Sequence, residues 1–561
     1  MHPRVIVLKF GGSVLTDVDS LRLAVHEVYR WRREGWAVVA VVSAFAGRTD
    51  ELLEKASQDR ISADPHAVAA MLSCGERESA AQLIACLDRV GISAALLDPV
   101  AISLRAKGPA LDACPDGFDT RVVHAGLDEC GIVVVPGFLA ADDLGRAVTL
   151  GRGGSDLTAL VLADGLCAER CRLIKDVDGL YEHDPAGDGP PPGRYERVSF
   201  DDALALDGSI VQHKAVRFAR DHRLSFEVCG LAGVKATEVG DHASRVSVPS
   251  HTPPRTRVAL LGLGVVGKGV AELLLQTPDR FEIVATSARD PQRHEGWCRC
   301  HGVPIPARDL REVASAGADV VVEAIGGVEA ARDAIAAALR GGAHVVTANK
   351  AVLAEHGAEL FALADACQAQ LLISASVGGG APILEAAARS EVAGIRGVLN
   401  GTANFVLGRL AIGVALDQAI AEAQELGLAE ADPTRDLDGR DAVDKLRVLA
   451  ERCGIEPRSI DRTRADIREV HPGEKRSQIA TLDHDGTLRL GLKRLADHDP
   501  IANLTNEWNA VELTFADGTS EVIRGRGAGR WPTAEAVLAD VLDLEREILG
   551  HHSERGSVQL A

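Results

Sequence analysis

The chain lacks three features that assign proteins to whole classes: an excess of positive charge, a long apolar run and a signal sequence. Its formal net charge is -20 over 561 residues, which argues against a nucleic-acid partner because a basic face is needed to neutralise phosphates. No run approaches the roughly 18 apolar residues that cross a bilayer. The first apolar run, residues 5–8, is too short for a signal peptide and ends at Lys9. These absences predict a cytosolic protein with no membrane or nucleic-acid partner.

The chain also lacks a cysteine pattern typical of disulfides or metal sites. Its 11 cysteines are odd in number and scattered, which is poor material for a disulfide framework. Cys298, Cys300 and His301 stand close together, but no second pair follows at the spacing of a zinc site. We therefore expect reduced thiols. Lysine is scarce as well, with 11 lysines among the 61 basic residues, so a lysine inside a motif is less readily explained as a surface residue.

The length and the order of the expected elements indicate several α/β domains. A chain of 561 residues with 46% hydrophobic and 25% charged residues predicts two to four globular domains. Near the N-terminus an apolar strand (5–8) precedes a helix pattern (20–34) and a second apolar strand (37–42). Strands that alternate with helices in this way are typical of a doubly wound sheet.

Two Gly-rich turns in the first half are candidate binding sites for an anion, a phosphate or a carboxylate. Lys9 ends the first strand and is followed by Gly11 and Gly12, whose lack of side chains lets backbone N–H groups approach an anion. This signal alone is weak, because many strands end in two glycines. The run from Gly151 to Asp156 is more specific, since it places N–H groups, a guanidinium and a carboxylate at the start of a helix.

Together with the runs around Glu76 and Asp176, these motifs resemble the catalytic domain of aspartate kinases, of the amino-acid kinase superfamily, over about residues 4–230. The resemblance implies phosphoryl transfer from ATP with Mg²⁺ to aspartate, catalysed by positioning and charge neutralisation. It assigns catalysis to Lys9 and Asp156. The implied ligand contacts are Ser43, Thr49, Glu76, Arg152 and Ser155 for aspartate, and Asp176 and Tyr181 for the nucleotide.

The first half departs from this family on the nucleotide side. Ala186 follows Pro185 where a basic residue is usual, and the run before His213 lacks the usual lysine. We therefore expect weakened ATP binding. A kinase fold that is kept only for assembly is the alternative.

The roughly 20 residues between the two halves cannot hold the ACT regulatory domains that such kinases usually carry. We therefore expect no feedback by an amino acid through such domains.

The second half begins with a dinucleotide-binding pattern. An apolar strand from Val258 leads into a Gly-x-Gly-x-x-Gly turn, and the next strand (281–286) ends before Arg289 and Asp290. Arg289 would pair with the 2′-phosphate of NADP, whereas Asp290 would bind the ribose hydroxyls of NAD. The pattern favours NADP. The turn residues that would contact the coenzyme are Gly262, Gly264, Val265, Val266 and Gly267.

The stretch from Glu430 to Gly454 is an acidic loop that runs into a helix, with Asp438 as the expected N-cap and Gly454 as the stop. Asp441 and Lys445 stand four residues apart and so lie one above the other on one face. For that pair alone, a solvated acidic helix with one ion pair is the favoured interpretation. However, the loop acids beside a lysine suit a small zwitterion, since carboxylates bind its ammonium group and a lysine transfers a proton to an oxygen.

This stretch closely resembles the substrate loop and catalytic helix of homoserine dehydrogenases, and four further motifs extend the resemblance to about residues 256–550. It implies that Lys445 donates the proton with help from Lys350, that Glu430 and Asp441 bind the substrate, and that Asp436 orients Lys445. The implied coenzyme contacts continue with Gly326, Thr347, Lys350, Gly427 and Gly527. Carbonyls of Val377, Gly379 and Ala381 would hold Na⁺, although a Gly-rich turn without an ion fits the same residues.

We therefore expect a fusion of an aspartate kinase domain without ACT domains and a homoserine dehydrogenase, acting in threonine, methionine and lysine biosynthesis as a homodimer or larger homo-oligomer. The expected boundaries are a kinase-like domain (1–246), a linker (247–257), a Rossmann domain (258–390), an α+β substrate domain (391–525) and a closing helix with a tail (526–561). Two alternatives are a dehydrogenase with a non-catalytic kinase-like domain, and a regulatory protein with both sites silent. The intact Lys350, Asp441 and Lys445 argue against the last.

Overall fold

The structure is a computed structural model that describes residues 4–57, 64–185, 192–231, 233, 235–247, 254–429, 432–462, 465–502, 504–527 and 530–558. The chain forms two compact units. The first contains Met1–Asp88 and Ser93–Thr252, and the second contains Arg89–Ile92 and Pro253–Ala561. Within the described ranges, no helix has the length and apolar character that a membrane span requires.

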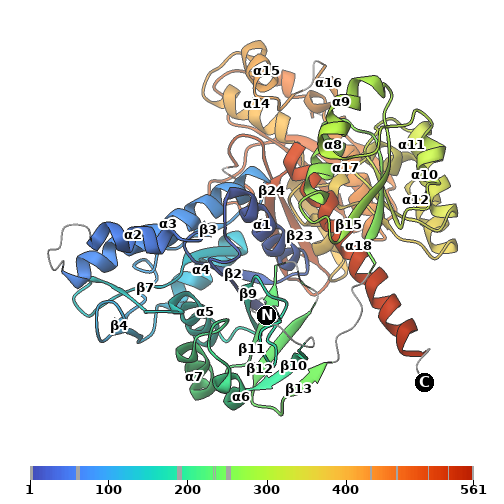
Figure 1. The fold of residues 1–561 in the computed structure, drawn as a ribbon. Coiled ribbons are helices and arrows are strands. Elements are labelled where there is room, and N and C mark those ends of the chain that lie inside the picture. The colour runs from blue at the N-terminus through green and yellow to red at the C-terminus, as the bar shows by residue number, and fades with distance from the viewer. Residues whose placement is uncertain are drawn as a thin grey trace. The chain divides into compact units, whose positions relative to one another are not determined.

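The first unit is built on a nine-stranded, mostly parallel sheet in the order β13-β10-β12-β11-β9-β1-β2-β6-β3 (Figure 1). Its central strands are short apolar runs that are buried on both faces, as is typical of parallel sheets. The strands are β1 (Val5–Phe10), β2 (Ala37–Val42), β3 (Ala95–Leu96), β6 (Ile132–Pro136), β9 (Arg170–Lys175), β10 (Arg194–Ser199), β11 (Phe226–Gly230), β12 (Ala236–Gly240) and β13 (Arg245–Ser247).

Helices pack against this sheet and position the motifs of the first half. The helices are α1 (Val18–Arg33), α2 (Arg48–Ser57), α3 (Pro65–Arg89), α4 (Thr120–Cys130), α5 (Gly154–Gly165), α6 (Phe200–Ala205) and α7 (His213–His222). Helix α5 is almost entirely buried and packs against β1 and β9, which are parallel neighbours. The carboxyl ends of β1 and β9 and the start of α5 therefore meet at one edge of the sheet.

The second unit contains a five-stranded parallel sheet in the order β15-β14-β16-β17-β18. Its strands are β14 (Thr256–Leu261), β15 (Phe281–Ser287), β16 (Val320–Glu323), β17 (His344–Thr347) and β18 (Leu371–Leu372). Helices α8 (Val265–Leu274), α11 (Glu329–Arg340), α12 (Lys350–Ala366) and α18 (Arg530–Val558) pack around it. The strand order reverses at β14, and a crevice at such a point is where open α/β sheets bind dinucleotides.

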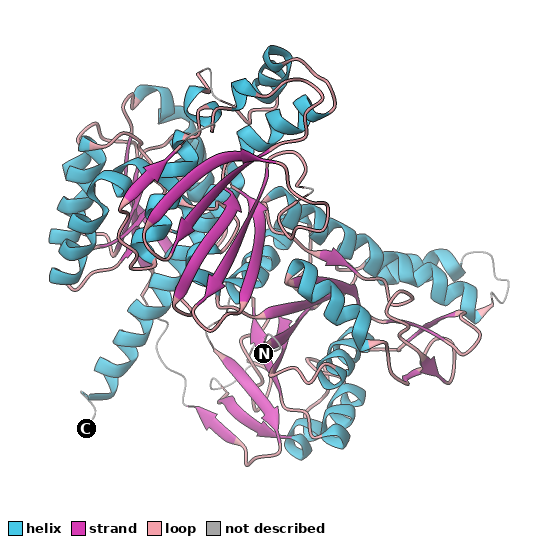
Figure 2. Ribbon diagram, turned by 180° about the vertical axis from the view of Figure 1, so that it is seen from behind, coloured by secondary structure: helices cyan, strands magenta, loops and turns pink. Residues whose placement is uncertain are grey.

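A six-stranded sheet, β20-β22-β21-β19-β23-β24, completes the second unit (Figure 2). It comprises β19 (Val392–Val398), β20 (Ser459–Asp461), β21 (Ser477–Asp483), β22 (Thr487–Lys493), β23 (Trp508–Phe515) and β24 (Ser520–Arg526). The helices are α14 (Gly401–Ala411), α15 (Leu416–Glu425), α16 (Thr434–Leu437) and α17 (Arg440–Arg452). Helix α17 packs against β21, β22 and α12. It therefore lies between the six-stranded sheet and the helix that begins with Lys350.

The fold class is confirmed: a doubly wound domain is joined to a Rossmann-type sheet and an α+β substrate domain. The prediction that Asp438 is the N-cap of α17 is wrong. Gly439 takes that place in a left-handed conformation, at φ 79, and α17 begins at Arg440. The carboxylate of Asp438 still accepts a hydrogen bond from the Arg440 backbone N–H at 3.1 Å. Gly454 adopts φ 69 just beyond the helix, which agrees with its expected role as a stop.

Candidate active sites

Two lysines from different elements of the second unit meet on one buried carboxylate. Asp441 and Lys445 lie one turn apart on α17 and are 5% and 4% exposed. Their Oδ2 and Nζ atoms are 3.0 Å apart, and Lys445 Nζ also donates to the carbonyl of Leu399 at 2.8 Å. Lys350, the first residue of α12, pairs with the other oxygen of Asp441. The carboxylate therefore fixes the position of both ammonium groups.

Burial and charge act in opposite directions on Asp441. Burial alone would raise its pKa, but the charges of Lys445 and Lys350 outweigh burial and hold the pKa well below its usual range. Asp441 therefore stays ionised at neutral pH and keeps both lysines in contact with it. The two ammonium groups that Asp441 holds suit an oxygen on which negative charge develops.

Asn400 joins the two acids of this site, a role that the sequence analysis missed. Its side-chain amide donates to Asp436 Oδ1 at 2.7 Å and to Asp441 Oδ2 at 2.8 Å. Its side-chain oxygen, Oδ1, caps α14 by accepting a hydrogen bond from the Ala403 N–H at 2.7 Å. An asparagine before a helix is readily explained as an N-cap, so sequence offered no separate signal for the second role.

Asp436 was expected to orient Lys445, and its described hydrogen bond is instead to Asn400. Burial raises the pKa of Asp436, and the Asn400 amide opposes that rise. The group that contacts Lys445 is Asp441, so an orienting role for Asp436 stays a prediction. Glu430, the other expected substrate contact, lies outside the described residues.

The Gly-rich turn after β14 has the backbone geometry of a dinucleotide site. Gly262 adopts φ 102, and a Cβ there would lie 2.8 Å from the carbonyl oxygen of Ala324. A Cβ on Gly267 would lie 1.8 Å from the carbonyl oxygen of Gly262. Helix α8 begins directly after Gly264, and Val265 in its first turn is 67% exposed. The start of this helix is thus accessible to a pyrophosphate.

A buried carboxylate supports the turn that carries Lys350. Glu323, at the end of β16, accepts hydrogen bonds from the Thr347 hydroxyl at 2.5 Å and from the Ile325 N–H at 2.8 Å. Asn349 donates its amide to the carbonyl of Gly327 at 2.7 Å. These bonds join the loop after β16 to the turn between β17 and α12. Thr347 is fully buried, so its contact is with Glu323, and its expected coenzyme contact stays a prediction.

The other expected coenzyme contacts lie in glycine turns. Gly326 adopts φ 71 beside Gly327, and Gly427 adopts φ 71 after α15. Gly527 follows β24, and a Cβ there would lie 1.8 Å from the side-chain amide of Asn509. Arg289 and Asp290 are both exposed after β15, where each remains accessible to the coenzyme ribose.

The expected cation loop presents only backbone oxygens. Val377 and Ala381 are buried, and Gly378 and Gly379 adopt φ 88 and 56. The carbonyl of Ala381 accepts a hydrogen bond from Ile383 at 2.8 Å and keeps one lone pair. Carbonyl donors fit a hard cation such as Na⁺. In the described part of the chain, no group of three His, Cys, Asp or Glu could hold a metal, and all eleven cysteines are thiols.

Two lysines also meet on one buried carboxylate in the first unit. Asp156 lies in the first turn of α5, 2.6 Å from Lys9 Nζ and 2.8 Å from Lys175 Nζ. The Lys9 and Asp156 side chains are 5% and 3% exposed. Burial lowers the pKa of Lys9 to about 8, which the charge of Asp156 opposes. The structure therefore places Lys9 and Asp156 together, as the sequence predicts, and adds Lys175 to them.

The expected aspartate contacts of the first unit lie on neighbouring elements. The hydroxyl of Ser79 on α3 donates to the Ser43 carbonyl at 2.7 Å, which ties that helix to the loop after β2. Glu76, one turn earlier, is 3% exposed, and its Oε2 atom has no hydrogen-bond partner. Burial raises its pKa to about 7. Thr49 lies in the first turn of α2, half-buried. The buried carboxylate of Glu76, with one oxygen that has no partner, suits an ammonium group.

The turn that leads into α5 brings the remaining motif residues to the same edge. Gly153 is the N-cap at φ 74. Ser155 is buried against Gly137, where a Cβ would lie 2.7 Å from the serine Cβ. Arg152 is exposed, so its guanidinium is accessible to a carboxylate.

The residues expected on the nucleotide side of the first unit are Asp176, Tyr181 and those of the run before His213. Lys214 donates to Asp112 at 2.7 Å and to the carbonyls of Ala113 and Leu150, so it braces the loop before α5. Tyr181 donates its hydroxyl to Asp178 at 2.6 Å. Asp176 is exposed, and Ala186 lies outside the described residues. Nucleotide contacts of Asp176 and Tyr181 stay predictions.

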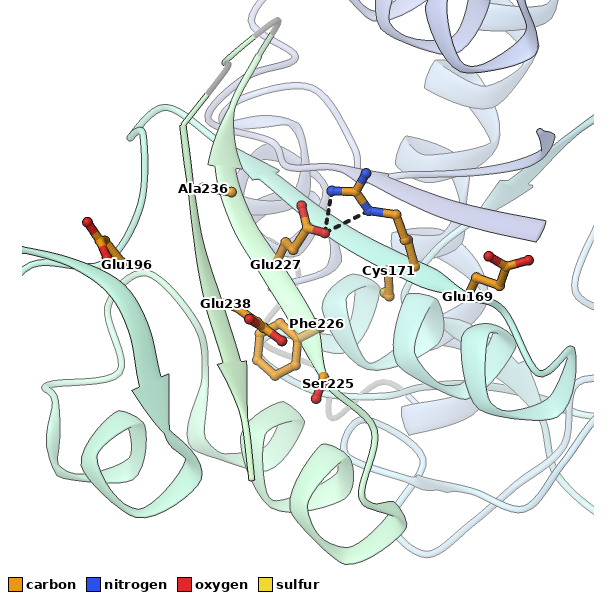
Figure 3. Close-up of a pocket in the computed structure, with 9 residues that line it drawn as sticks. Glu169, Cys171, Glu196, Ser225, Phe226, Glu227, Ala236 and Glu238 are labelled. Carbon is orange, nitrogen blue, oxygen red and sulfur yellow. Dashed lines mark hydrogen bonds and ion pairs between the residues drawn. The ribbon is translucent and has the colours of Figure 1, made fainter. Parts of the chain in front are cut away.

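A separate pocket of about 320 Å³ lies over β9, β11 and β12 (Figure 3). Each of its four glutamates is ion-paired: Glu169 with Arg4, Glu196 with Arg245, Glu227 with Arg170 and Glu238 with Arg197. Because these carboxylates already have partners, the pocket has the character of a solvated sheet face.

Comparisons with known proteins agree with this division. Residues 4–228 match the amino acid kinase family, residues 262–374 the NAD-binding domain of homoserine dehydrogenase, and residues 381–542 homoserine dehydrogenase. A homoserine dehydrogenase of Neisseria gonorrhoeae is 33% identical over 314 residues, which cover 52% of this chain and 72% of the relative.

An aspartate kinase of Pseudomonas putida is 31% identical over 226 residues, which cover 40% of this chain and 55% of the relative. The chain thus spans about half the length of that kinase. The crystal structure of a homoserine dehydrogenase from Thiobacillus denitrificans is 32% identical, covers 53% of this chain and 74% of that chain, and has a TM-score of 0.48. The family models and the two relatives confirm both resemblances drawn from the sequence.

Proposed function

The chain belongs to the homoserine dehydrogenase family, and from this premise we propose that it interconverts L-aspartate 4-semialdehyde and L-homoserine with a nicotinamide coenzyme. Its first unit is an amino acid kinase domain, so the protein is a fused kinase and dehydrogenase. The observation that carries the dehydrogenase proposal is the convergence of Lys350 and Lys445 on the buried Asp441. Homoserine-dependent reduction of the coenzyme tests it.

The geometry supports a division of labour in the dehydrogenase site. The bound nicotinamide supplies the hydride. Lys445 is the proton donor to the oxygen of the nascent alkoxide, because it is buried and held by Asp441 and the Leu399 carbonyl. Lys350 is the less buried of the two, with a side chain 36% exposed, and adds a second positive charge beside that oxygen. Asp441 then serves as the anchor of both lysines.

The exposed Arg289 supports a preference for NADP. We expect Arg289→Ala to weaken NADP binding by roughly one to two decades and NAD binding far less, because a charge-assisted contact to the 2′-phosphate is worth about 1.5–3 kcal/mol. Michaelis constants for both coenzymes measure the effect. Arg299→Ala is the matched control, since Arg299 is exposed on helix α9 (Gln292–His301) and paired with Glu295. Equal weakening of both coenzymes would show that Arg289 does not contact the phosphate.

For the first unit we propose ATP- and Mg²⁺-dependent phosphorylation of L-aspartate. The proposal is supported by the buried Lys9–Asp156 pair and by the partnerless oxygen of Glu76. Weak saturation by ATP, and insensitivity to lysine and threonine, stay predictions. Formation of aspartate hydroxamate in the presence of ATP and hydroxylamine tests the activity. A folded chain that forms none would support the alternative of a kinase-like domain kept for assembly.

The raised pKa of Glu76 predicts a pH dependence for the kinase. The ionised carboxylate would pair with the ammonium group of aspartate, and with a pKa of about 7 it becomes protonated as the pH falls below neutrality. We therefore expect kcat/KM for aspartate to fall about tenfold per pH unit below that pKa. Glu76→Gln should abolish this limb and leave low activity at all pH values. Glu78→Gln, which alters an exposed residue of the same helix, should keep it. An unchanged limb in Glu76→Gln would assign the titration to another group.

Several finer features belong to the same proposal. We propose a cytosolic homodimer or larger homo-oligomer that acts in threonine, methionine and lysine biosynthesis. We also propose that the carbonyl loop at Val377, Gly379 and Ala381 binds Na⁺. Analytical ultracentrifugation tests the oligomeric state. The rate of the dehydrogenase in Na⁺, compared with its rate in choline, tests the cation site.

A further inference from the structure

We propose that Lys175 is a second phosphoryl-binding lysine of the kinase site, which holds the transferred phosphoryl group of a nucleoside triphosphate together with Lys9. The inference rests on the proposed kinase function. Lys175 is the last residue of β9, and Lys9 lies near the end of the adjacent parallel strand β1. Both ammonium groups therefore reach the same edge of the sheet and contact the same carboxylate, that of Asp156.

The charges of this cluster do not balance. Lys175 Nζ lies 2.8 and 3.1 Å from the two oxygens of Asp156, and Lys9 Nζ lies 2.6 Å from one of them. Two cations thus share one anion, and the three side chains are 5%, 3% and 12% exposed for Lys9, Asp156 and Lys175. A buried excess of positive charge is unfavourable unless an anion compensates it. A phosphoryl group supplies such an anion.

Gly11 lies beside both lysines. A Cβ on Gly11 would lie 3.4 Å from Lys9 Nζ and 3.6 Å from Lys175 Cδ, so the glycine keeps side-chain atoms out of the space beside both stems. Lys214, the other lysine near the loop before α5, is held by Asp112 and two carbonyls. Lys214 is therefore engaged outside this cluster, and Lys175 is the lysine that adds a second positive charge beside Lys9.

In the proposed transfer, a carboxylate oxygen of aspartate forms a bond to the γ-phosphorus. The bond from that phosphorus to the β–γ bridging oxygen breaks, and the electron pair leaves with ADP. Negative charge is spread over the three equatorial oxygens throughout. Lys175 and Lys9 stabilise those oxygens, and Asp156 holds both ammonium groups in place.

Lys175→Met tests the inference by rate, by pH profile and by binding. We expect kcat for ATP-dependent aspartate phosphorylation to fall about 10–100-fold, and the affinity for tripolyphosphate, measured by calorimetry, to fall about tenfold. The charge of Lys175 contributes to the lowered pKa of Lys9, after burial. Loss of the Lys9 proton at high pH would form the basic limb of the kinase pH profile. Removing the charge of Lys175 should raise the pKa of Lys9 and so move this limb to higher pH, which the loss of a merely structural residue would not do. Lys175→Arg should restore part of the rate.

Lys214→Met is the matched control, because it removes a lysine of the same domain that braces a loop. It should leave the basic limb in place. Unchanged tripolyphosphate affinity and an unmoved limb in Lys175→Met would overturn the inference while the kinase function stands. A wild-type chain that phosphorylates no aspartate would refute the kinase function instead, and the loss of tripolyphosphate binding in Lys175→Met would still decide whether Lys175 binds the anion.

Discussion

Lys445→Ala is expected to lower the turnover of homoserine oxidation by about 10²–10⁴-fold and to leave coenzyme binding nearly unchanged. Lys445 is buried on α17, with its ammonium group on Asp441 and on the Leu399 carbonyl. Alanine removes the group that we propose as the proton donor. The coenzyme turn at Gly262 belongs to a different element, β14 and the start of α8, and is not altered by the change. Steady-state kinetics and coenzyme titration by fluorescence measure the two effects.

Arg447→Ala is the control for this variant, since Arg447 lies on the same helix with a side chain 42% exposed. Its turnover should remain within a few-fold of the wild type. If Lys445→Ala also kept turnover within a few-fold, Lys350 would be the principal acid and the assignment made here would be wrong.

Asp441→Asn is expected to lower turnover by about 10²-fold or more, because one carboxylate holds both lysines. Asparagine is neutral, and its amide nitrogen would face the donors of Lys350, Lys445 and Asn400. Breaking a buried ion pair by removing one partner typically costs about 3–5 kcal/mol of stability. The free energy of unfolding must therefore be measured by denaturant titration beside the kinetics.

Asp444→Asn provides the matched comparison for stability. Asp444 lies on the same helix with a side chain 15% exposed, and it pairs with Arg435. Asp444→Asn should retain most of the stability and keep turnover within a few-fold of the wild type, because burial raises the pKa of Asp444 and its ionised form is not favoured by the fold. If Asp441→Asn kept wild-type turnover while folded, the two lysines would not depend on their shared carboxylate, and the proposed anchor would be refuted.

Local patterns in the sequence predicted the elements that carry the sites. The apolar run 37–42 is the strand Ala37–Val42, and the expected helix 20–34 is found as Val18–Arg33. The four-residue spacing of Asp441 and Lys445 placed them on one face, where they form an ion pair. Such features depend on periodicity within a few residues, which a single sequence displays.

Contacts between distant segments could not be predicted in this way. Lys350 and Asp441 are 91 residues apart in the chain, and their meeting depends on how α12 packs against α17. Lys175 reaches Asp156 because β9 is the neighbour of β1, a pairing that the sequence does not specify. The bridge that Asn400 makes between Asp436 and Asp441 likewise requires α16 and α17 to be in place.

The most direct test of the central claim is the initial rate of homoserine oxidation by the full chain, measured with NAD and with NADP. We expect homoserine-dependent reduction of the coenzyme, faster with NADP at equal concentration, and a rate that collapses in Lys445→Ala. A folded wild-type chain that binds coenzyme but reduces neither form in the presence of homoserine would contradict the proposed dehydrogenase.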